Sequence, residues 1–405
     1  MRRIPVGNFI IGKEEKAAVN AVLDSGRISE GKYTRLFEQE WAKYIGTKYA
    51  VALNSGTSAI IAGLLFLIYD DRFPKVKPGA KVITSPVTYI ATANAIKLAG
   101  LEPVFVDIDP NDFTINCDQV ELILKKDKDI AAMIPVHLFG FPNDMDRLSY
   151  LSKKYDVVLF EDSAQAHGTI YKGKKVGSLS LLSNFSFYIA HNIQAGELGV
   201  IVTNDSKIFS MIKKIKANGR MCDCAECSRH KGSCKYSKGD RIYEVDPRFH
   251  HELIGYNFKT TEFQTALALS QLKHADKIFR KRSGNVKYLN SKLNKYKHII
   301  NLPPYNKNVS YLAYPITIKD QNIISRRYLR KCLEERGVET RSLFGCIPNQ
   351  QPAYSGYHEL YKDNLPNADF VGSNGFYIGC HQYLTKIDLN YMVKVFGEAL
   401  DGIKK

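Results

Sequence analysis

Residues 49–68, YAVALNSGTSAIIAGLLFLI, decide the fold of this chain. A short apolar run ends at Leu53, a turn of small polar residues follows, and a second apolar run of helical length comes next. This order predicts a buried strand, a turn and a helix. Such a unit is typical of a parallel sheet that is covered by helices.

The segments on both sides repeat this alternation. Short β-rich runs predict strands at 81–86, 103–109, 130–138, 157–162, 182–190 and 198–204. Helical spacing predicts helices at 12–26, 88–100, 117–126, 145–155, 206–220 and 260–282. We therefore predict an α/β fold with a mostly parallel sheet and helices on both faces. Residues 1–270 form the large domain, in which 220–250 is an insertion. Residues 271–405 contribute a connecting helix and a smaller α+β domain.

Composition narrows the class of protein. The chain has 405 residues, 44% of them hydrophobic, and a formal net charge of +16. Its longest apolar stretch, residues 59–69, is too short to span a bilayer, and residues 1–16 lack a signal pattern. We expect a cytoplasmic protein without a membrane partner. The lysines are spread along the chain and no nucleic-acid motif is found, so the charge fits an anionic substrate such as a nucleotide-linked one.

Several segments suit a pyridoxal-type cofactor. In NSGTSA (54–59), the Ser55 and Thr57 hydroxyls and the backbone N–H groups around Gly56 are placed at a helix start, where a phosphate binds favourably. Small polar residues also cap ordinary helices, so this motif alone is not specific. Ser186 offers a further phosphate contact.

The ring of such a cofactor needs other partners. Asp162, which ends a predicted strand in EDSAQAHG (161–168), can pair with the pyridine nitrogen. Gln165, three residues later, can reach the ring hydroxyl. Tyr89 offers an aromatic face for stacking, although an aromatic residue at such a position is more often part of the core.

These strings, in this order, resemble the DegT/DnrJ/EryC1/StrS sugar aminotransferase family. The likeness extends to residues 37–59, 103–110, 134–146 and 255–272. It implies fold type I of the pyridoxal phosphate enzymes, with a seven-stranded sheet, and a homodimer with shared active sites. By the same likeness, Asn257 reaches the cofactor phosphate of the neighbouring subunit.

His191 stands where that family carries the lysine that binds the cofactor covalently. Histidine forms no such bond, but it exchanges protons near neutral pH. Within the family, histidine at this position marks 3-dehydratases that hold pyridoxamine phosphate noncovalently and act on a nucleotide-linked 4-keto-6-deoxyhexose. The resemblance therefore implies that His191 is the base for loss of the C3 hydroxyl. A structural histidine in an inactive relative that only binds a sugar nucleotide is the alternative.

Four of the eight cysteines fall within thirteen residues: Cys222, Cys224, Cys227 and Cys234. Four thiolates this close can ligate an iron–sulfur cluster or zinc. The insertion resembles that of the CDP-6-deoxy-4-keto-glucose 3-dehydrases, a branch of the family that carries a 2Fe–2S cluster and takes electrons from a reductase. Likenesses at 73–82, 337–354 and 365–393 point to the same branch.

This chain departs from that branch after Asp162, where Ser163 and Ala164 replace a distant cluster ligand. Cys227 would then be the fourth ligand, and 2Fe–2S, 4Fe–4S and zinc all stay open. The insertion is basic, with Arg220, Arg229, Lys231, Lys235, Lys238 and Arg241. We expect an iron–sulfur enzyme whose basic insertion docks an acidic flavin reductase or ferredoxin-type donor; the alternative is that these basic residues only solvate a loop. The alternative is a glutamate-regenerated dehydratase, of the GDP-4-keto-6-deoxymannose type, with a structural zinc. Arg341, in GVETRSLF, is a candidate for the substrate diphosphate.

Overall fold

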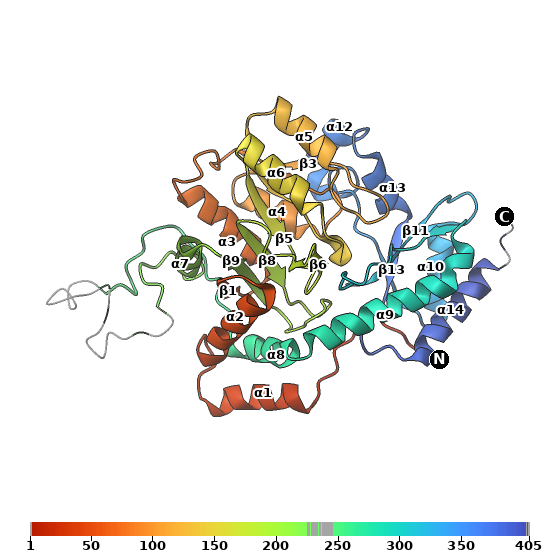
Figure 1. Ribbon diagram of the computed structural model, residues 1–405, viewed down its shortest axis with the longest axis horizontal. Coiled ribbons are helices and arrows are strands. Elements are labelled where there is room, and N and C mark those ends of the chain that lie inside the picture. Colours follow the sequence, from red (N-terminus) through yellow and green to blue (C-terminus); the bar gives the residue numbers. More distant parts are fainter. Residues whose placement is uncertain are drawn as a thin grey trace.

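The computed structural model describes residues 2–224, 227, 234, 236, 246–401 and 403. A seven-stranded sheet forms its centre, in the order β1-β9-β8-β5-β4-β2-β3 (Figure 1). Neighbouring strands are parallel except for β9, which runs antiparallel to both β1 and β8. The predicted mostly parallel sheet is thereby confirmed. The strands are β1 (Tyr49–Leu53), β2 (Lys81–Thr84), β3 (Glu102–Phe105), β4 (Ile130–Ile134), β5 (Val158–Asp162), β8 (Leu182–Ser186) and β9 (Gly199–Thr203).

Helices cover both faces of this sheet because successive strand residues point to opposite sides. Along β1, Val51 and Leu53 pack with α3, α4 and α7, whereas Ala50 and Ala52 pack with α2 and with α8 (Glu262–Leu272). Helices α5 and α6 cover the second face beside β4. The bounds are α1 (Lys13–Asp24), α2 (Lys32–Ile45), α3 (Gly56–Tyr69), α4 (Ala91–Leu98), α5 (Cys117–Lys126), α6 (Met145–Tyr155) and α7 (Ser206–Ile215).

One predicted helix, residues 260–282, is in fact two. α8 (Glu262–Leu272) ends at a turn in which His274 N donates to Gln271 O at 2.8 Å, and α9 (Ala275–Leu293) begins after it. The break lets α8 pack against α1 and α2, while α9 reaches the C-terminal helix α14 (Figure 1). Apolar spacing alone could not reveal the turn, since both helices keep the same period.

A four-stranded antiparallel sheet, ordered β10-β11-β13-β12, lies in the C-terminal part. Its strands are β10 (Ile300–Asn301), β11 (Tyr314–Ile318), β12 (Thr340–Ser342) and β13 (Gly375–Ile378). The helices here are η4 (Asn294–Tyr296), α10 (Arg326–Glu335), α11 (Ile347–Gln350), η5 (Pro352–Tyr357), α12 (His358–Tyr361), α13 (Pro366–Asn374) and α14 (Lys386–Leu400). The two sheets lie on opposite sides of the predicted 270/271 boundary, which remains a proposal.

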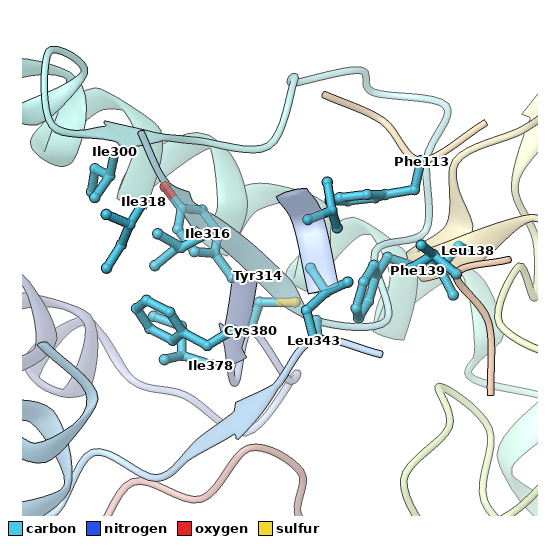
Figure 2. Packing of buried hydrophobic residues seen from close by; sticks show 14 of the residues in the cluster. Phe113, Leu138, Phe139, Ile300, Tyr314, Ile316, Ile318, Leu343, Ile378 and Cys380 are labelled. Carbon is cyan, nitrogen blue, oxygen red and sulfur yellow. The ribbon is translucent and has the colours of Figure 1, made fainter. Parts of the chain in front are cut away.

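A shared core joins the two sheets. Figure 2 shows Phe139, from the first half of the chain, beside Leu343, and Tyr314 beside Cys380, while Phe113 packs against the Phe139 ring at 5.6 Å between centroids. Phe139 belongs to the short turn η1 (Leu138–Gly140), which follows β4, and β6 (Ile170–Tyr171) pairs with β7 (Lys174–Lys175) in a small hairpin. In the described ranges, no helix is both long enough and apolar enough to cross a membrane.

Candidate active site

The predicted phosphate residues meet at the turn between β1 and α3. Ser55 caps α3 by accepting a hydrogen bond from Ser58 N at 3.0 Å. A Cβ on Gly56 would lie 2.7 Å from Ser186 Cβ, and one on Gly199 would lie 1.9 Å from Ser55 O. The structure thus brings Ser55, Gly56 and Ser186 together, and we call this group the phosphate cradle. Its close packing requires glycine at positions 56 and 199. Thr57 lies half-buried on the first turn of the same helix.

Asp162 ends β5 and is 3% exposed. Its Oδ2 accepts from Thr92 Oγ1 at 2.8 Å, and its Oδ1 accepts from Asn184 Nδ2 at 3.0 Å and from Ala164 N at 3.2 Å. Burial raises the pKa of this carboxyl, while these donors act in the opposite direction. A protonated pyridine nitrogen would supply the positive partner that the ionised carboxylate needs.

Neither Thr92 nor Asn184 is predicted as a site residue from the sequence. Thr92 lies on α4, seventy residues before Asp162, and nothing in its local pattern marks it. Asn184 could have been found, because it precedes Ser186 by two residues on β8 and therefore faces the same side. Two strand residues span about 6.6 Å, so one face of β8 carries both the Asp162 partner Asn184 and the predicted phosphate residue Ser186.

Gln165 is held in one orientation. Its Oε1 accepts from Phe139 N at 2.9 Å, which leaves the amide NH2 group to donate elsewhere. Phe139 has a left-handed φ of 54°, unusual for an aromatic residue and typical of strained functional positions. The predicted role of Gln165 as a donor to the ring hydroxyl is compatible with this orientation.

His191 lies in the loop between β8 and β9 and is half-buried. Its ring lies 6.0 Å from the ring of His167 and 6.3 Å from that of Tyr188, measured between centroids. Burial lowers the pKa of His191 to about 4, and the positive charge of Arg282 acts in the same direction. In the described structure its Nδ1 is buried without a hydrogen-bond partner. The imidazole is therefore neutral at pH 7 and able to accept a proton.

Three of the predicted site residues are exposed to solvent. The Tyr89 side chain is 61% exposed, and its ring contacts the Phe344 ring at 6.1 Å. Arg341 on β12 is exposed and bonds Glu339 at 3.3 Å. Asn257 is exposed beside Phe258, whose carbonyl accepts from Asn54 N at 2.8 Å. Their roles in stacking, diphosphate binding and the partner's phosphate site stay predictions.

The four clustered cysteines, Cys222, Cys224, Cys227 and Cys234, line one cavity of about 260 Å³. Cys222 and Cys234 are buried, and Cys227 is exposed. Burial also raises the pKa of the Cys222 thiol. Within the described residues, no three His, Cys, Asp or Glu side chains are assembled to hold a metal ion. The predicted iron–sulfur cluster is therefore not supported by this structure.

The cavity also contains many cations: Arg27, Arg35, Lys213, Lys216, Arg220, Arg248 and Lys259. Lys216 Nζ, on its wall, donates to Glu30 Oε1 and to Ala52 O, both at 2.8 Å. Ala52 lies on β1, three residues before Ser55, so Lys216 links the cavity wall to the strand that leads into the phosphate cradle. The predicted basic residues Arg229, Lys231, Lys235, Lys238 and Arg241 lie outside the described residues.

Known proteins share this architecture. The model of the DegT/DnrJ/EryC1/StrS aminotransferase family matches residues 10–396. A dTDP-4-dehydro-2,6-dideoxy-D-glucose 3-dehydratase from Saccharopolyspora spinosa is 30% identical over 97% of this chain and 86% of its own. A mutant GDP-4-keto-6-deoxymannose-3-dehydratase with bound GDP-perosamine superposes with a TM-score of 0.86 at 26% identity, covering 97% and 100% of the two chains.

A second structure of a GDP-4-keto-6-deoxymannose-3-dehydratase, with a trapped PLP–glutamate geminal diamine, gives a TM-score of 0.84 at 25% identity, covering 97% and 100%. These likenesses confirm the predicted family and fold. They also confirm the enzyme class, that of pyridoxal-phosphate-dependent sugar-nucleotide dehydratases and aminotransferases. They give no support to the CDP-specific branch or to a cluster.

Proposed function

Since this chain belongs to the DegT/DnrJ/EryC1/StrS aminotransferase family, we propose that it is a 3-dehydratase of a nucleotide-linked 4-keto-6-deoxyhexose. One observation carries the proposal: a neutral, half-buried histidine, His191, where the family resemblance expects the covalent lysine. An imidazole beside the cofactor leaves the amine of pyridoxamine phosphate free for the substrate, and it still moves protons.

The residues at the β1–α3 turn and at the end of β5 fit the cofactor. Ser55, Gly56 and Thr57, together with Ser186, would hold its phosphate at the start of α3. When bound, pyridoxamine phosphate supplies an amine for the sugar's 4-keto group and a ring that accepts electrons. Asp162 would keep the ring nitrogen protonated.

The remaining residues orient the ring and move the protons. Gln165 would donate to the ring hydroxyl through its free amide group. We propose that His191 removes a proton from the carbon next to the ring and passes it to the departing C3 hydroxyl. Tyr89 would close over the ring, and Arg341 would bind the substrate diphosphate.

Glutamate is the proposed source for regenerating the amine. A GDP-4-keto-6-deoxymannose-3-dehydratase of the same fold binds a PLP–glutamate adduct, and this supports the same route here. In this version of the enzyme, the cysteine insertion has no part in the reaction, and a zinc bound there would be structural.

A second candidate is an iron–sulfur-dependent reductive dehydratase, and one observation favours it. All four clustered cysteines line one cavity whose wall also carries seven cationic side chains, among them Lys216, which donates to Ala52 O on the strand before the phosphate cradle. Thiolates carry negative charge, so surrounding cations would stabilise a thiolate-bound centre. An acidic flavin or ferredoxin-type donor would then supply two electrons.

We also propose a homodimer with shared sites. The exposed Asn257 would reach the partner's phosphate group, as the family resemblance implies. A nucleotide sugar fits the chain's charge of +16.

The test is an assay of the anaerobically purified protein with pyridoxamine phosphate and GDP- or CDP-linked 4-keto-6-deoxyhexose, with 3-deoxy product detected by mass spectrometry. Product with glutamate alone supports the first candidate. Product that requires a reduced ferredoxin, in protein with matching iron and sulfide, supports the second. His191→Asn should lower the rate of product formation by about 10²–10⁴-fold while cofactor stays bound. Full activity in this variant would contradict the proposed base, and failure to bind either cofactor form would favour a non-catalytic relative.

A further inference from the structure

Arg282, on α9, carries a buried positive charge that has no role in the proposed reaction. It is 1% exposed, and its guanidinium donates to Leu312 O at 2.8 Å, to Tyr311 O at 3.3 Å and to Gln382 Oε1 at 3.0 Å. None of these partners, in the described part of the chain, is a carboxylate. Burying a cation among neutral acceptors costs free energy of desolvation. A neutral donor could link α9 to the chain around Tyr311 at a smaller desolvation cost, so the charge itself calls for an explanation.

Arg282 donates hydrogen bonds to the segment Ser310–Leu312. The same segment also binds the loop that carries the proposed base, His191. Asn192, the residue after His191, is buried, and its Nδ2 donates to Ser310 O at 3.2 Å. Ser310 is fixed in turn, because its backbone N donates to Thr169 Oγ1 at 3.1 Å. The His191 loop is therefore anchored at Ser310, next to Tyr311 and Leu312, whose carbonyls accept from the Arg282 guanidinium.

Ser310–Leu312 is also hydrogen-bonded to Phe139, the residue that orients Gln165. Leu312 N donates to Phe139 O at 3.0 Å, and Phe139 N is the donor that orients Gln165. Tyr311 and Phe139 both have left-handed φ angles, of 46° and 54°. Non-glycine residues adopt this region at a cost, and they keep it only where surrounding contacts hold them. Arg282 supplies two of those contacts through the carbonyls of Tyr311 and Leu312.

The charge of Arg282 acts on His191 beyond this geometry. The rings that face His191 are those of Tyr188 and His167, and burial lowers the pKa of His167 well below its ordinary value. Burial lowers the pKa of Arg282 from its high ordinary value, but a guanidinium stays charged at pH 7, and its field opposes protonation of both histidines. His381, adjacent to the Arg282 partner Gln382, has its pKa lowered to about 4 by burial first and by the same cation.

We propose that Arg282 is a positioning residue that fixes the His191 loop through Ser310–Leu312, and that its charge, acting together with burial, disfavours the protonated imidazole until His191 takes up the proton from the carbon next to the cofactor ring. This inference rests on the proposed role of His191 as the base. An imidazolium formed beside a fixed cation is a stronger acid than one in water. His191 would therefore return its proton readily to the departing hydroxyl, so the same charge assists both halves of the proton transfer.

The test measures protonation of His191 directly, by NMR titration of the cofactor-free full chain with isotope-labelled histidine. The His191 signal is assigned by its absence in His191→Asn, and circular dichroism defines the pH range in which each variant stays folded. Arg282→Gln removes the charge and Arg282→Lys keeps it. Gln382→Glu places a carboxylate at the guanidinium without altering Arg282, so the charge is tested even where Arg282→Gln does not fold.

We expect Arg282→Gln and Gln382→Glu to raise the His191 midpoint by at least about half a pH unit, and Arg282→Lys to leave it near the native value. In loaded enzyme, the acid limb of the kcat profile should move upward by the same amount. A His191 midpoint that is unchanged in both charge variants would overturn the proposal. Because the titration needs no cofactor and no turnover, that result is distinct from a failure of the dehydratase assignment.

Discussion

Thr92→Val offers a sharp test of how the site holds the cofactor ring. Thr92 Oγ1 donates to Asp162 Oδ2 at 2.8 Å, and valine keeps the shape of the side chain while it removes the donor. Asp162 keeps its bonds from Asn184 and Ala164, so the carboxylate should stay in place. The ionised form of Asp162 loses one of its stabilising partners, and its pKa, already raised by burial, should rise further.

The size of the effect follows from the bond that is lost. A hydrogen bond to a charged group contributes about 1.5–3 kcal/mol, and each 1.4 kcal/mol changes an equilibrium tenfold. Because two donors remain on Asp162, the lower end applies, and we expect cofactor affinity to fall by about tenfold. The loss should grow as the pH falls, since a carboxyl with a raised pKa becomes protonated at higher pH and then no longer pairs with the ring nitrogen.

The assay is a spectrophotometric titration of the cofactor-free protein with pyridoxal phosphate between pH 5 and 8 (roughly the range of maximal protein stability). Thr88→Val is the matched control, because Thr88 Oγ1 lies 3.2 Å from Thr92 Oγ1 and makes no described bond to Asp162. Equal affinities of Thr92→Val and Thr88→Val at every pH would refute the reasoning that Asp162 holds the ring.

Three further changes test other parts of the structure. Gly56→Ala should weaken phosphate and cofactor binding and cost about 1–3 kcal/mol of stability, because its Cβ would lie 2.7 Å from Ser186 Cβ; Gly284→Ala, where nothing lies within 4 Å, should be neutral or stabilising by thermal denaturation. Glu262→Ala should lower the free energy of unfolding in denaturant by at least about 3 kcal/mol, since this buried carboxylate accepts four bonds at the start of α2, and a native midpoint would contradict it. His381, with its pKa lowered to about 4, stabilises the fold fully above pH 6.5 and loses that contribution, on the order of 3 kcal/mol, as the pH falls toward 4; His381→Gln should flatten this part of the stability profile.

Local sequence patterns predicted much of the fold. The helices predicted at 117–126 and 145–155 coincide with α5 and α6, and the predicted strand 157–162 contains β5. These elements are specified by the spacing of neighbouring residues, so no knowledge of the tertiary structure is needed. The helix predicted at 260–282 is wrong in one respect, because its interruption at His274 depends on which helices α8 and α9 pack against.

The candidate site divides in the same way. The sequence by itself marked Ser55, Gly56 and Asp162 as candidates, because strand ends and helix starts are visible in short stretches of chain, whereas His191 was marked by the family resemblance, which places a lysine at this position. Only the tertiary structure decided which distant residues hydrogen-bond to these candidates and to the loops that carry them. Thr92 lies seventy residues from Asp162 in the sequence. Arg282 donates to Leu312, about thirty residues away, in the segment that binds the His191 loop. Such pairings arise when the sheet and the long helix bring distant segments together, and no local pattern of apolar or charged residues encodes them.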